Sequence, residues 1–169
     1  LRTQAYKRPR KPLIAFTPKQ LLRLSAAASH IDEFTSGSFQ PVIGDTTITD
    51  PSAVTRVLLC TGRLYYDLAK ERAQRGDTST AIIRLEQLYP LPEAEVAEAL
   101  AQYPNATVTW VQDEPRNQGA WPHLALNLFP SLRRPVRLVS RPESATTAAG
   151  RASLHKEQAA TLIAQAFEG

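Results

Sequence analysis

The chain has 169 residues, 43% of them hydrophobic, and a formal net charge of +4 at pH 7. This length fits one domain with a substantial buried core, and the hydrophobic content excludes an intrinsically disordered protein. No apolar run approaches the roughly 18 residues that a membrane-spanning helix requires, and the first residues lack the apolar region of a signal peptide. We therefore expect no membrane partner.

The single cysteine, Cys60, lies within an apolar run. One cysteine forms no disulfide within the chain, which suits a reducing compartment, so we expect a cytoplasmic protein. Its apolar neighbours favour a small buried side chain over a nucleophile. The chain begins with Leu and contains no Met, which indicates a piece of a longer polypeptide.

Positive charge is concentrated at the amino-terminal end. Residues 12–169 carry 15 basic and 16 acidic side chains and are therefore close to neutral. A basic segment can bind nucleic acid or phosphate, but a solvated linker is the simpler interpretation. We divide the chain into a basic linker, residues 1–11, and a domain, residues 12–169, and expect no nucleic-acid partner. The five cations of the linker are Arg2, Lys7, Arg8, Arg10 and Lys11, with no acid among them.

The first predicted elements are short. Residues 12–16 (PLIAF) form an apolar run that predicts a strand. Thr17-Pro18 is a favourable helix start, with Thr as the N-cap and Pro at the first helical position, so we expect a helix of about two to three turns after it. Residues 39–43 are a second short run, which Pro41 limits to an edge or irregular strand. The polar stretch that follows predicts an exposed loop.

Three apolar runs dominate the centre of the chain, at residues 57–60, 81–85 and 108–111. They alternate with longer segments of helical periodicity, which is typical of a βαβαβ unit with parallel strands and right-handed crossovers. We expect the first helix to end at Gly76 and the second to begin at Glu93. The expected buried face of the second helix consists of Val96, Ala97, Leu100 and Ala101.

The carboxy-terminal part continues the same pattern. We expect a short helix over residues 120–129, a strand over residues 136–139, a loop over residues 141–151 and an amphipathic closing helix. The predicted fold class is therefore α/β, a mostly parallel sheet flanked by helices. The apolar positions expected in the short helix include Leu124, Leu126 and Leu128.

Ligands and partners of open parallel sheets bind at the carboxyl ends of the strands. Here these ends carry Thr61-Gly62, Glu86-Gln87 and the polar loop 112–119. Thr61-Gly62 could present amides to an anion at a helix N-terminus, but the glycine-rich patterns of dinucleotide and P-loop sites are absent. Glu86 and Glu114 could form a carboxylate pair for acid–base chemistry, although salt bridges at the surface or an interface are the simpler interpretation.

Other catalytic or metal-binding residues are not apparent in the sequence. His30, His123 and His155 are far apart and lack the spacing of metal ligands, so we expect no metal site. No nucleophile elbow or Cys–His arrangement occurs. The residues alone therefore indicate a small α/β domain with one polar rim, and they do not indicate a self-contained enzyme.

Five ordered blocks carry a family resemblance. Residues 11–23 (KPLIAFTPKQLLR) resemble the RPLIVFTPKSLLR segment of the thiamine-diphosphate-dependent decarboxylating component of 2-oxoglutarate dehydrogenase. The loop around residues 112–121 is most similar to actinobacterial members, although Asp113 stands where the family often has Glu. The other blocks are VLLCTGRLYYDL at 57–68, RLEQLYPLP at 84–92, YPN at 103–105 and WVQDEPRNQGAW at 110–121.

The resemblance implies a non-catalytic, transketolase-like C-terminal domain that supports the active-site domains and the dimer. In that superfamily thiamine diphosphate and magnesium lie between two other domains, and the Gly-Asp-Gly…Asn-Asn thiamine motif is missing here, so neither is expected to bind this chain. The implied parent enzyme oxidatively decarboxylates 2-oxoglutarate to a succinyl group in the citric acid cycle, and this chain alone is expected to be inactive. The implied partners are the remainder of the parent polypeptide, a homodimer mate, and the acyltransferase and dihydrolipoyl dehydrogenase components of the complex.

We expect the polar rim to pack against the parent's pyrimidine-binding domain or the dimer mate. The basic linker could hold an acidic effector, a nucleotide or an acyl-coenzyme A, through Arg2 and Lys7, since some family members bind such regulators. Two other functions stay open: an autonomous flavodoxin-like phosphate- or nucleotide-binding module, and a basic-armed nucleic-acid binder. The expected rim residues are Glu86, Gln112, Glu114, Asn117 and Gln118.

Overall fold

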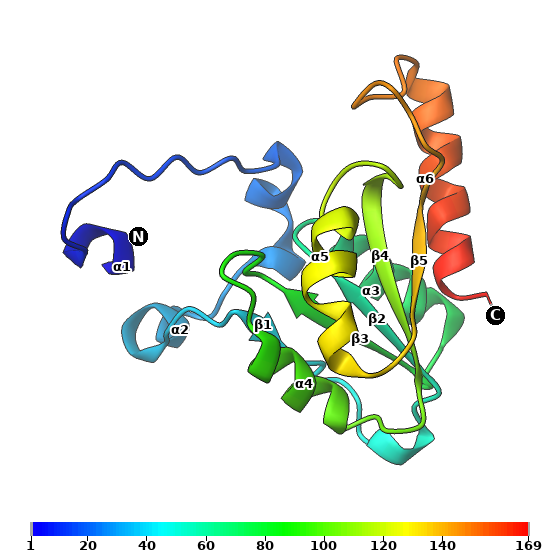
Figure 1. Cartoon of the computed structure of the whole chain (residues 1–169), viewed down its shortest axis with the longest axis horizontal. Coiled ribbons are helices and arrows are strands. Elements are labelled where there is room, and N and C mark those ends of the chain that lie inside the picture. The colour runs from blue at the N-terminus through cyan, green and yellow to red at the C-terminus, as the bar shows by residue number, and fades with distance from the viewer. Residues whose placement is uncertain (1, 169) are drawn as a thin grey trace.

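A five-stranded sheet of order β1-β3-β2-β4-β5 forms the centre of the computed structural model, which describes residues 2–168, with side chains from Gln4 onward (Figure 1). Neighbouring strands are parallel except for β1, which runs antiparallel to β3. The predicted α/β fold with a mostly parallel sheet is thus confirmed. The strands are β1 (Val42–Ile43), β2 (Arg56–Cys60), β3 (Thr80–Leu85), β4 (Thr107–Pro115) and β5 (Val136–Arg141).

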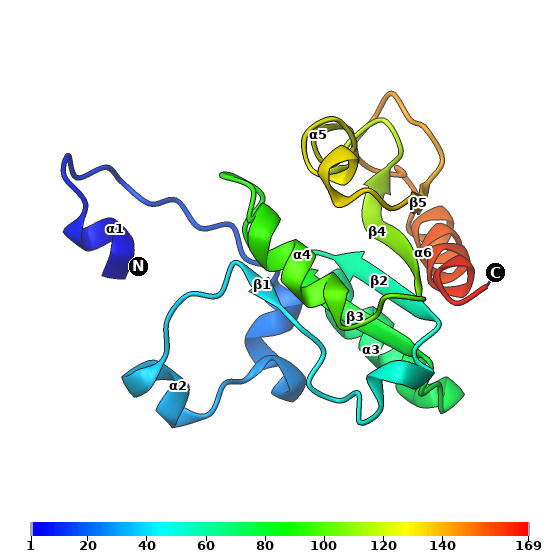
Figure 2. The same ribbon diagram turned by 60° about the horizontal axis from the view of Figure 1, so that its bottom comes forward.

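Helices cover both faces of this sheet. Figures 1 and 2 place α4 (Glu93–Ala101) and α5 (Trp121–Asn127) on one face, and α3 (Leu64–Arg75) and α6 (Ala152–Ala166) on the other. None of the helices in residues 2–168 combines the length and the apolar character that a membrane span needs. The short elements are α1 (Arg2–Tyr6), α2 (Ile31–Ser36) and the 3-10 helices η1 (Lys19–Arg23), η2 (Ser25–Ala27), η3 (Pro51–Ala53) and η4 (Phe129–Leu132).

The three central strands are buried on both sides. Residues 57–60 of β2 have no exposed surface, and the side chains of β3 and β4 alternate between two apolar clusters. Leu59, Ile83 and Trp110 face α4 and α5, whereas Leu58 and Ile82 face α3 and α6. Burial on both faces explains why these strands appear in the sequence as continuous apolar runs instead of alternating ones.

One predicted helix face needs correction, and the apolar positions of a second helix differ in burial. The buried residues of α4 are Val96, Ala99 and Leu100, because the side of the helix that faces the sheet follows the i, i+3, i+4 spacing from Val96. Ala97 and Ala101, which were predicted to be buried, are exposed. In α5, Leu124 is buried but Leu126 is 79% exposed. A residue two positions further along a helix lies on nearly the opposite side.

The amino-terminal forty residues do not join the sheet. The predicted strand over residues 12–16 is wrong for this chain, since no strand forms there and all five residues are exposed. The helix predicted after Pro18 is only the 3-10 turn η1. Figures 1 and 2 show this segment leading away from the sheet on the β1 side. A strand needs a neighbouring strand to pair its backbone, and the described residues offer none at this place.

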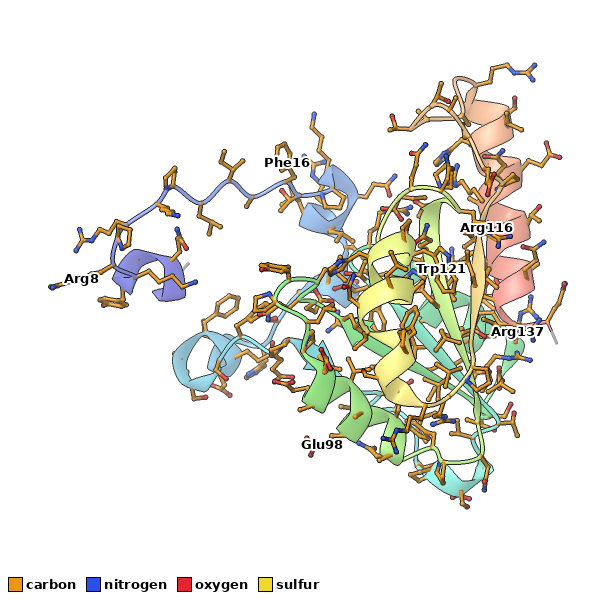
Figure 3. The ribbon with its side chains drawn as sticks, viewed as in Figure 1. Arg8, Phe16, Glu98, Arg116, Trp121 and Arg137 are labelled. Atoms are coloured by element: carbon orange, nitrogen blue, oxygen red, sulfur yellow. The ribbon has the colours of Figure 1, made fainter. Side chains whose placement is uncertain are left out.

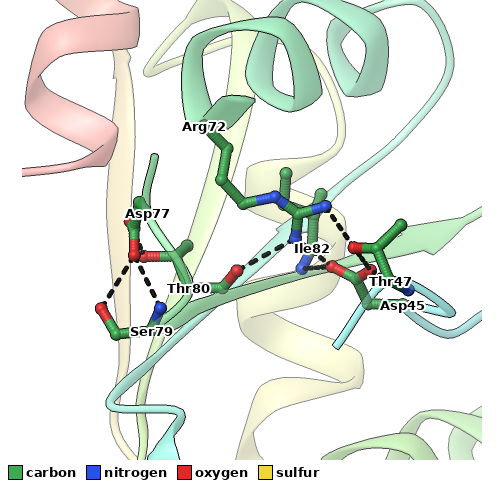
Figure 4. A network of polar contacts seen from close by, with 7 residues as sticks. All are labelled: Asp45, Thr47, Arg72, Asp77, Ser79, Thr80 and Ile82. Carbon is green, nitrogen blue, oxygen red and sulfur yellow. Dashed lines mark hydrogen bonds and ion pairs between the residues drawn. The ribbon is translucent and has the colours of Figure 1, made fainter. Parts of the chain in front are cut away.

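The loop after β1 is less exposed than predicted, because the side chain of Asp45 is buried. Its carboxylate accepts hydrogen bonds from the backbone amide of Ile82 (2.8 Å) and from the Arg72 guanidinium (Figure 4). Arg72 also donates to the carbonyl of Thr80 at 3.0 Å. Strand β1 is only two residues long, so the Asp45 carboxylate occupies the place of a backbone acceptor beside β3. Burial alone would raise the pKa of Asp45, but hydrogen bonds from Arg72 and Thr47 lower it.

Candidate functional site

A cluster of ion pairs lies at the carboxyl ends of β2, β4 and β5. The Asp113 carboxylate accepts from Arg63 on one oxygen and from Arg141 on the other, both at 2.6 Å. Arg63 also pairs with Asp67, one turn into α3, at 2.7 Å. We call these four residues the rim cluster. It joins three strands and one helix through side chains that are distant in sequence.

Local backbone geometry positions the rim cluster. Gly62 has a φ of +61°, which lets the chain turn sharply between β2 and α3 and brings Arg63 over the strand ends. Strand β4 is irregular against β5: Val111 pairs with Val139, and Pro115 with Arg141, so residues 112–114 bulge out of register. A bulge redirects side chains at the end of a strand, and here it directs Asp113 toward both arginines.

Arg141 is the buried member of the rim cluster, with 7% of its side chain exposed. Its guanidinium also contacts Nδ1 of His155 at 2.9 Å and Oε1 of Gln158 at 3.5 Å, both on α6. Its Nε has no hydrogen-bond partner among the described residues. The cluster therefore attaches α6 to the strand ends as well.

The electrostatics of the rim cluster favour fixed charges. Burial would raise the pKa of Asp113, but hydrogen bonds from Arg141 and Arg63 lower it. Burial likewise would lower the pKa of Arg63, and the pairing with Asp113 and Asp67 raises it. A general acid or base works best with a pKa near the working pH, and these shifts move the pKa values of Asp113 and Arg63 further from pH 7. The cluster is thus suited to holding elements together.

The buried side chain of Gln112 holds the segment 110–121 together by hydrogen bonds. It is 2% exposed, and its Oε1 accepts from the indole Nε1 of Trp110 (3.0 Å) and the backbone amide of Trp121 (2.9 Å). Its Nε2 donates to the carbonyls of Pro115 (3.0 Å) and Gln118 (2.8 Å). These bonds hold both ends of the loop against the core.

Asn117 and Gln118 fasten the loop to the segment after β5. The Asn117 side chain donates to the carbonyl of Ser144 at 3.0 Å and accepts from the Ser144 amide at 3.1 Å. Gln118 Nε2 donates to the carbonyls of Ser144 and Thr146, at 2.9 and 3.2 Å. Both residues are thus near the surface, where they join two loops.

Glu86 and Glu114 do not meet. Glu86 follows β3 and Glu114 lies in β4, and β2 separates these two strands. Glu86 lies 3.8 Å from the Nε of Arg84, whereas Glu114 is exposed and makes no ion pair with a described residue. The close approach of its side chain requires Gly119, where a Cβ would come within 2.9 Å of the Cβ of Glu114.

The remaining candidates are dispersed. Thr61-Gly62 forms the turn before α3, and Gln87 donates to the carbonyl of Pro90 at 2.7 Å. His30 caps α2 through its Nδ1, and His123 contacts Asn127 in α5. Across residues 2–168, no three His, Cys, Asp or Glu side chains come together as a metal site.

Cys60 is fully buried, as expected for a small apolar side chain. Burial and then the nearby Glu86 charge raise the pKa of its thiol to about 12. A thiol with this pKa is not the thiolate that a nucleophile requires. In the basic linker, Lys7 is exposed, and the side chain of Arg2 lies outside the described residues.

Two grooves lie near the rim. One of about 560 Å³ runs between α3 and α6 and is lined by Arg63, Asp67, Asp113 and His155. The other, of about 910 Å³, follows the whole of β5 and is bordered by Arg116 and Trp121, with Arg137 on the strand (Figure 3). The sequence alone does not assign Arg63, Arg141 or His155 to the rim. Arg63 and Arg141 lie at strand ends, which is a signal for these two, but the convergence of all three depends on the fold.

Comparisons with known proteins cover nearly the whole chain. A model of the family described as 2-oxoglutarate dehydrogenase C-terminal matches residues 28–167. The 2-oxoglutarate dehydrogenase E1 component of Haemophilus influenzae is 44% identical over 170 residues, which are 99% of this chain and 18% of the relative.

Actinobacterial relatives match equally well. The 2-oxoglutarate dehydrogenase E1/E2 component of Corynebacterium glutamicum is 45% identical over 174 residues, which are 99% of this chain and 14% of the relative. A multifunctional 2-oxoglutarate metabolism enzyme of Mycolicibacterium vanbaalenii is 41% identical over 165 residues, which are 93% of this chain and 13% of the relative. The chain thus spans less than a fifth of the length of these relatives.

Proposed function

Because this chain belongs to the 2-oxoglutarate dehydrogenase C-terminal family, we propose that it is the non-catalytic C-terminal domain of an enzyme that oxidatively decarboxylates 2-oxoglutarate. The product would be a succinyl group of the citric acid cycle. The observation that carries this proposal is the identity of 44% to a 2-oxoglutarate dehydrogenase E1 component along 99% of the chain. The alternative of an autonomous flavodoxin-like binding module receives no support from these relatives.

The role that we propose for the domain is architectural. In support, Asp113 and its two arginines pair with each other, and Gln112 makes its hydrogen bonds within the domain. A rim whose side chains are bonded within the domain suits a surface that supports a neighbouring domain. We propose that Glu86, Glu114, Asn117 and Gln118 contact the pyrimidine-binding domain of the parent or the dimer mate, with Gln112 holding the loop from behind.

Thiamine diphosphate and magnesium would be held by other parts of the parent enzyme, where the cofactor would supply the electron-accepting chemistry that decarboxylation needs. Magnesium in such sites is bound by carboxylates together with phosphate oxygens. The described residues of this chain do not fit that role, since no such group of acidic side chains gathers among them. No step of the reaction is therefore assigned to this chain.

The other partners and the location belong to the same proposal. The parent would act in the cytoplasm as a homodimer, with acyltransferase and dihydrolipoyl dehydrogenase components. An acidic effector at Arg2 and Lys7 stays a proposal, and Lys7 is accessible for it. The division into residues 1–11 and 12–169 is a proposal too, and the exposure of residues 12–20 favours a later boundary. Limited proteolysis of the chain would locate this boundary.

The test is an assay of carbon dioxide release from 2-oxoglutarate. The intact parent, supplied with thiamine diphosphate and magnesium, should decarboxylate 2-oxoglutarate, and the 169-residue chain under the same conditions should not. Turnover by the chain alone would refute the non-catalytic role. An intact parent that leaves 2-oxoglutarate unchanged would refute the assignment of the activity.

The contact that we propose for the rim has its own test. Charge reversal by Glu114→Lys should weaken dimerisation or activity of the parent, whereas Glu98→Lys, at an exposed position of α4, should change neither. Equal behaviour of the two variants would remove Glu114 from the contact surface.

A further inference from the structure

Residues 12–16 have the sequence of a strand but no partner strand. Ile14 is 75% exposed and Phe16 is 94% exposed, and Figure 3 shows Phe16 on a segment that leads away from the sheet. In an extended chain, residues two positions apart lie on the same side, so these two side chains would form one apolar face. Exposed apolar side chains in such a cluster mark a surface that binds another structure.

The backbone of this segment is unpaired as well. Among the described residues, no amide or carbonyl of residues 12–16 takes part in a hydrogen bond. Backbone groups that are buried must be paired, and an added strand satisfies this requirement at the edge of a sheet. The segment therefore offers both parts of a strand-addition motif, an apolar face and a free hydrogen-bonding edge.

The charge around the segment indicates what surrounds its binding site. Residues 1–27 contain seven cations and no acid, whereas residues 28–169 contain 13 basic and 16 acidic side chains. Lys11 immediately precedes the segment and Lys19 follows Phe16 by three positions, and Arg8 projects far from the sheet (Figure 3). A complementary site would carry carboxylates beside its apolar surface.

The family comparison indicates where that site lies. The family model begins at residue 28, but the relatives align along 99% of the chain, including residues 12–16. More than four fifths of each relative lies outside the aligned region. Residues 12–16 are thus aligned with proteins in which most of the polypeptide lies outside the aligned region, and this remainder could supply a partner strand. The segment also lies outside residues 28–167, which match the family model.

The sheet formed by the described residues offers no suitable edge strand with which residues 12–16 could pair. Its β1 edge is two residues long, and its other edge, β5, lies on the opposite side of the molecule from residues 12–16 (Figures 1 and 2). After the segment, Leu21 and Leu24 line a groove of about 540 Å³ together with Tyr65 and Tyr66 of α3. The chain thus passes beside α3 after residues 12–16, on the side of the sheet away from β5.

We propose that residues 12–16 form a strand on the edge of a sheet in a part of the parent polypeptide outside this chain, beside acidic side chains. The segment would then couple this domain to that neighbouring part through backbone hydrogen bonds and through Ile14 and Phe16. The proposal rests on the membership of this chain in a longer enzyme, which is the premise of the proposed function.

Hydrogen exchange of the intact parent tests the proposal directly. The amides of residues 13–16 should exchange at least about 100-fold more slowly than in an unstructured peptide, as expected for a paired strand. Exchange at the rate of an unstructured peptide would overturn the proposal. Protection that disappears on dilution of the parent would assign the strand to a second copy of the chain, and this result too would overturn it.

Variants identify the side chains involved. Phe16→Asp in the parent should accelerate exchange of residues 13–16 by at least about tenfold, because a buried charge is costly. The matched control is Leu126→Asp, a change to another exposed apolar residue, and it should leave this exchange unchanged. If Phe16→Asp prevents folding, Phe16→Ala and Leu126→Ala replace the pair. Equal effects of the two matched variants would overturn the role of Phe16.

Activity on 2-oxoglutarate is measured in the same samples, which separates the two proposals. An active parent with unprotected residues 13–16 contradicts only the strand. A parent that shows protection but no activity on 2-oxoglutarate contradicts only the proposed function.

Discussion

Replacing Asp45 by Ala should destabilise the chain more than any substitution at its surface. The side chains of Asp45 and Arg72 are 3% and 10% exposed, and they form a buried ion pair. Removal of one partner leaves a buried, uncompensated charge, which costs about 3–5 kcal/mol. Asp45→Ala also leaves the amide of Ile82 without an acceptor. Domains of this size are stable by roughly 5–15 kcal/mol, so the loss is a large share of the total.

Two further variants separate the contributions. Asp45→Asn keeps an acceptor for the Ile82 amide but removes the charge, so its loss should be smaller, about 1.5–3 kcal/mol. The double variant Asp45→Ala with Arg72→Met removes both charges and should lose less than the sum of the single changes, by about 1–3 kcal/mol. A purely additive result would show that the two side chains do not interact.

The assay is urea unfolding of the 169-residue chain, followed by tryptophan fluorescence and circular dichroism. Glu98→Ala, at an exposed position of α4 (Figure 3), is the matched control and should change stability by less than about 0.5 kcal/mol. The pKa of Asp45 is lowered in the folded state, so its contribution is present above its ordinary pKa of 3.8 and lost as the pH falls below it. A loss under about 1 kcal/mol in Asp45→Ala at pH 7 would refute this account of the network.

Three more predictions concern the loop at the end of β4. Gln112→Ala leaves the Trp110 indole N–H and the Trp121 amide without their acceptor, and it should cost about 2–3 kcal/mol in the same unfolding assay. A loss below about 1 kcal/mol would contradict these hydrogen bonds. Gly119→Ala should cost about 1–3 kcal/mol, since its φ is +67° and a Cβ would collide with a neighbouring side chain, whereas Gly150→Ala, with a φ of +71° and open space, should cost less; equal losses would exclude the collision. The pKa of Asp113 is lowered in the folded state, so the stability that its carboxylate contributes is present above pH 3.8 and lost on acidification. Between pH 6 and pH 3, the free energy of unfolding should therefore fall less in Asp113→Asn than in the natural chain. Parallel curves of unfolding free energy against pH would contradict the pairing.

The central layers of the fold followed from the sequence, because each of the three central strands is buried on both faces. Residues 57–60, 81–85 and 108–111 are continuous apolar runs for that reason, and they correspond to β2, β3 and β4. Elements with little local signal are harder to predict. Helix α5 is seven residues long, and two turns do not distinguish the buried Leu124 from the exposed Leu126.

The candidate site was predictable only in outline. The polar segment 112–119 could be placed at strand ends, since parallel strands end at the same edge of a sheet. The prediction of a loop over all of it is wrong, because residues 112–115 continue β4. Which side chains of this segment face outward depended on the bulge in β4, and no local pattern in the sequence specifies a bulge. Gln112 therefore looked like an exposed polar residue, although it is buried against Trp110.

Apolar runs and helical periodicity are enough to predict the layers of this protein, because they record which surfaces are buried. The residues of the ordered blocks are enough to indicate the family. The rim cluster, in which Arg63, Asp113 and Arg141 meet from three strand ends, depends instead on long-range contacts. The tertiary structure also left residues 12–16 without a neighbour. Both outcomes depend on contacts between residues far apart in the chain, and a one-dimensional pattern contains no information on which distant groups will meet.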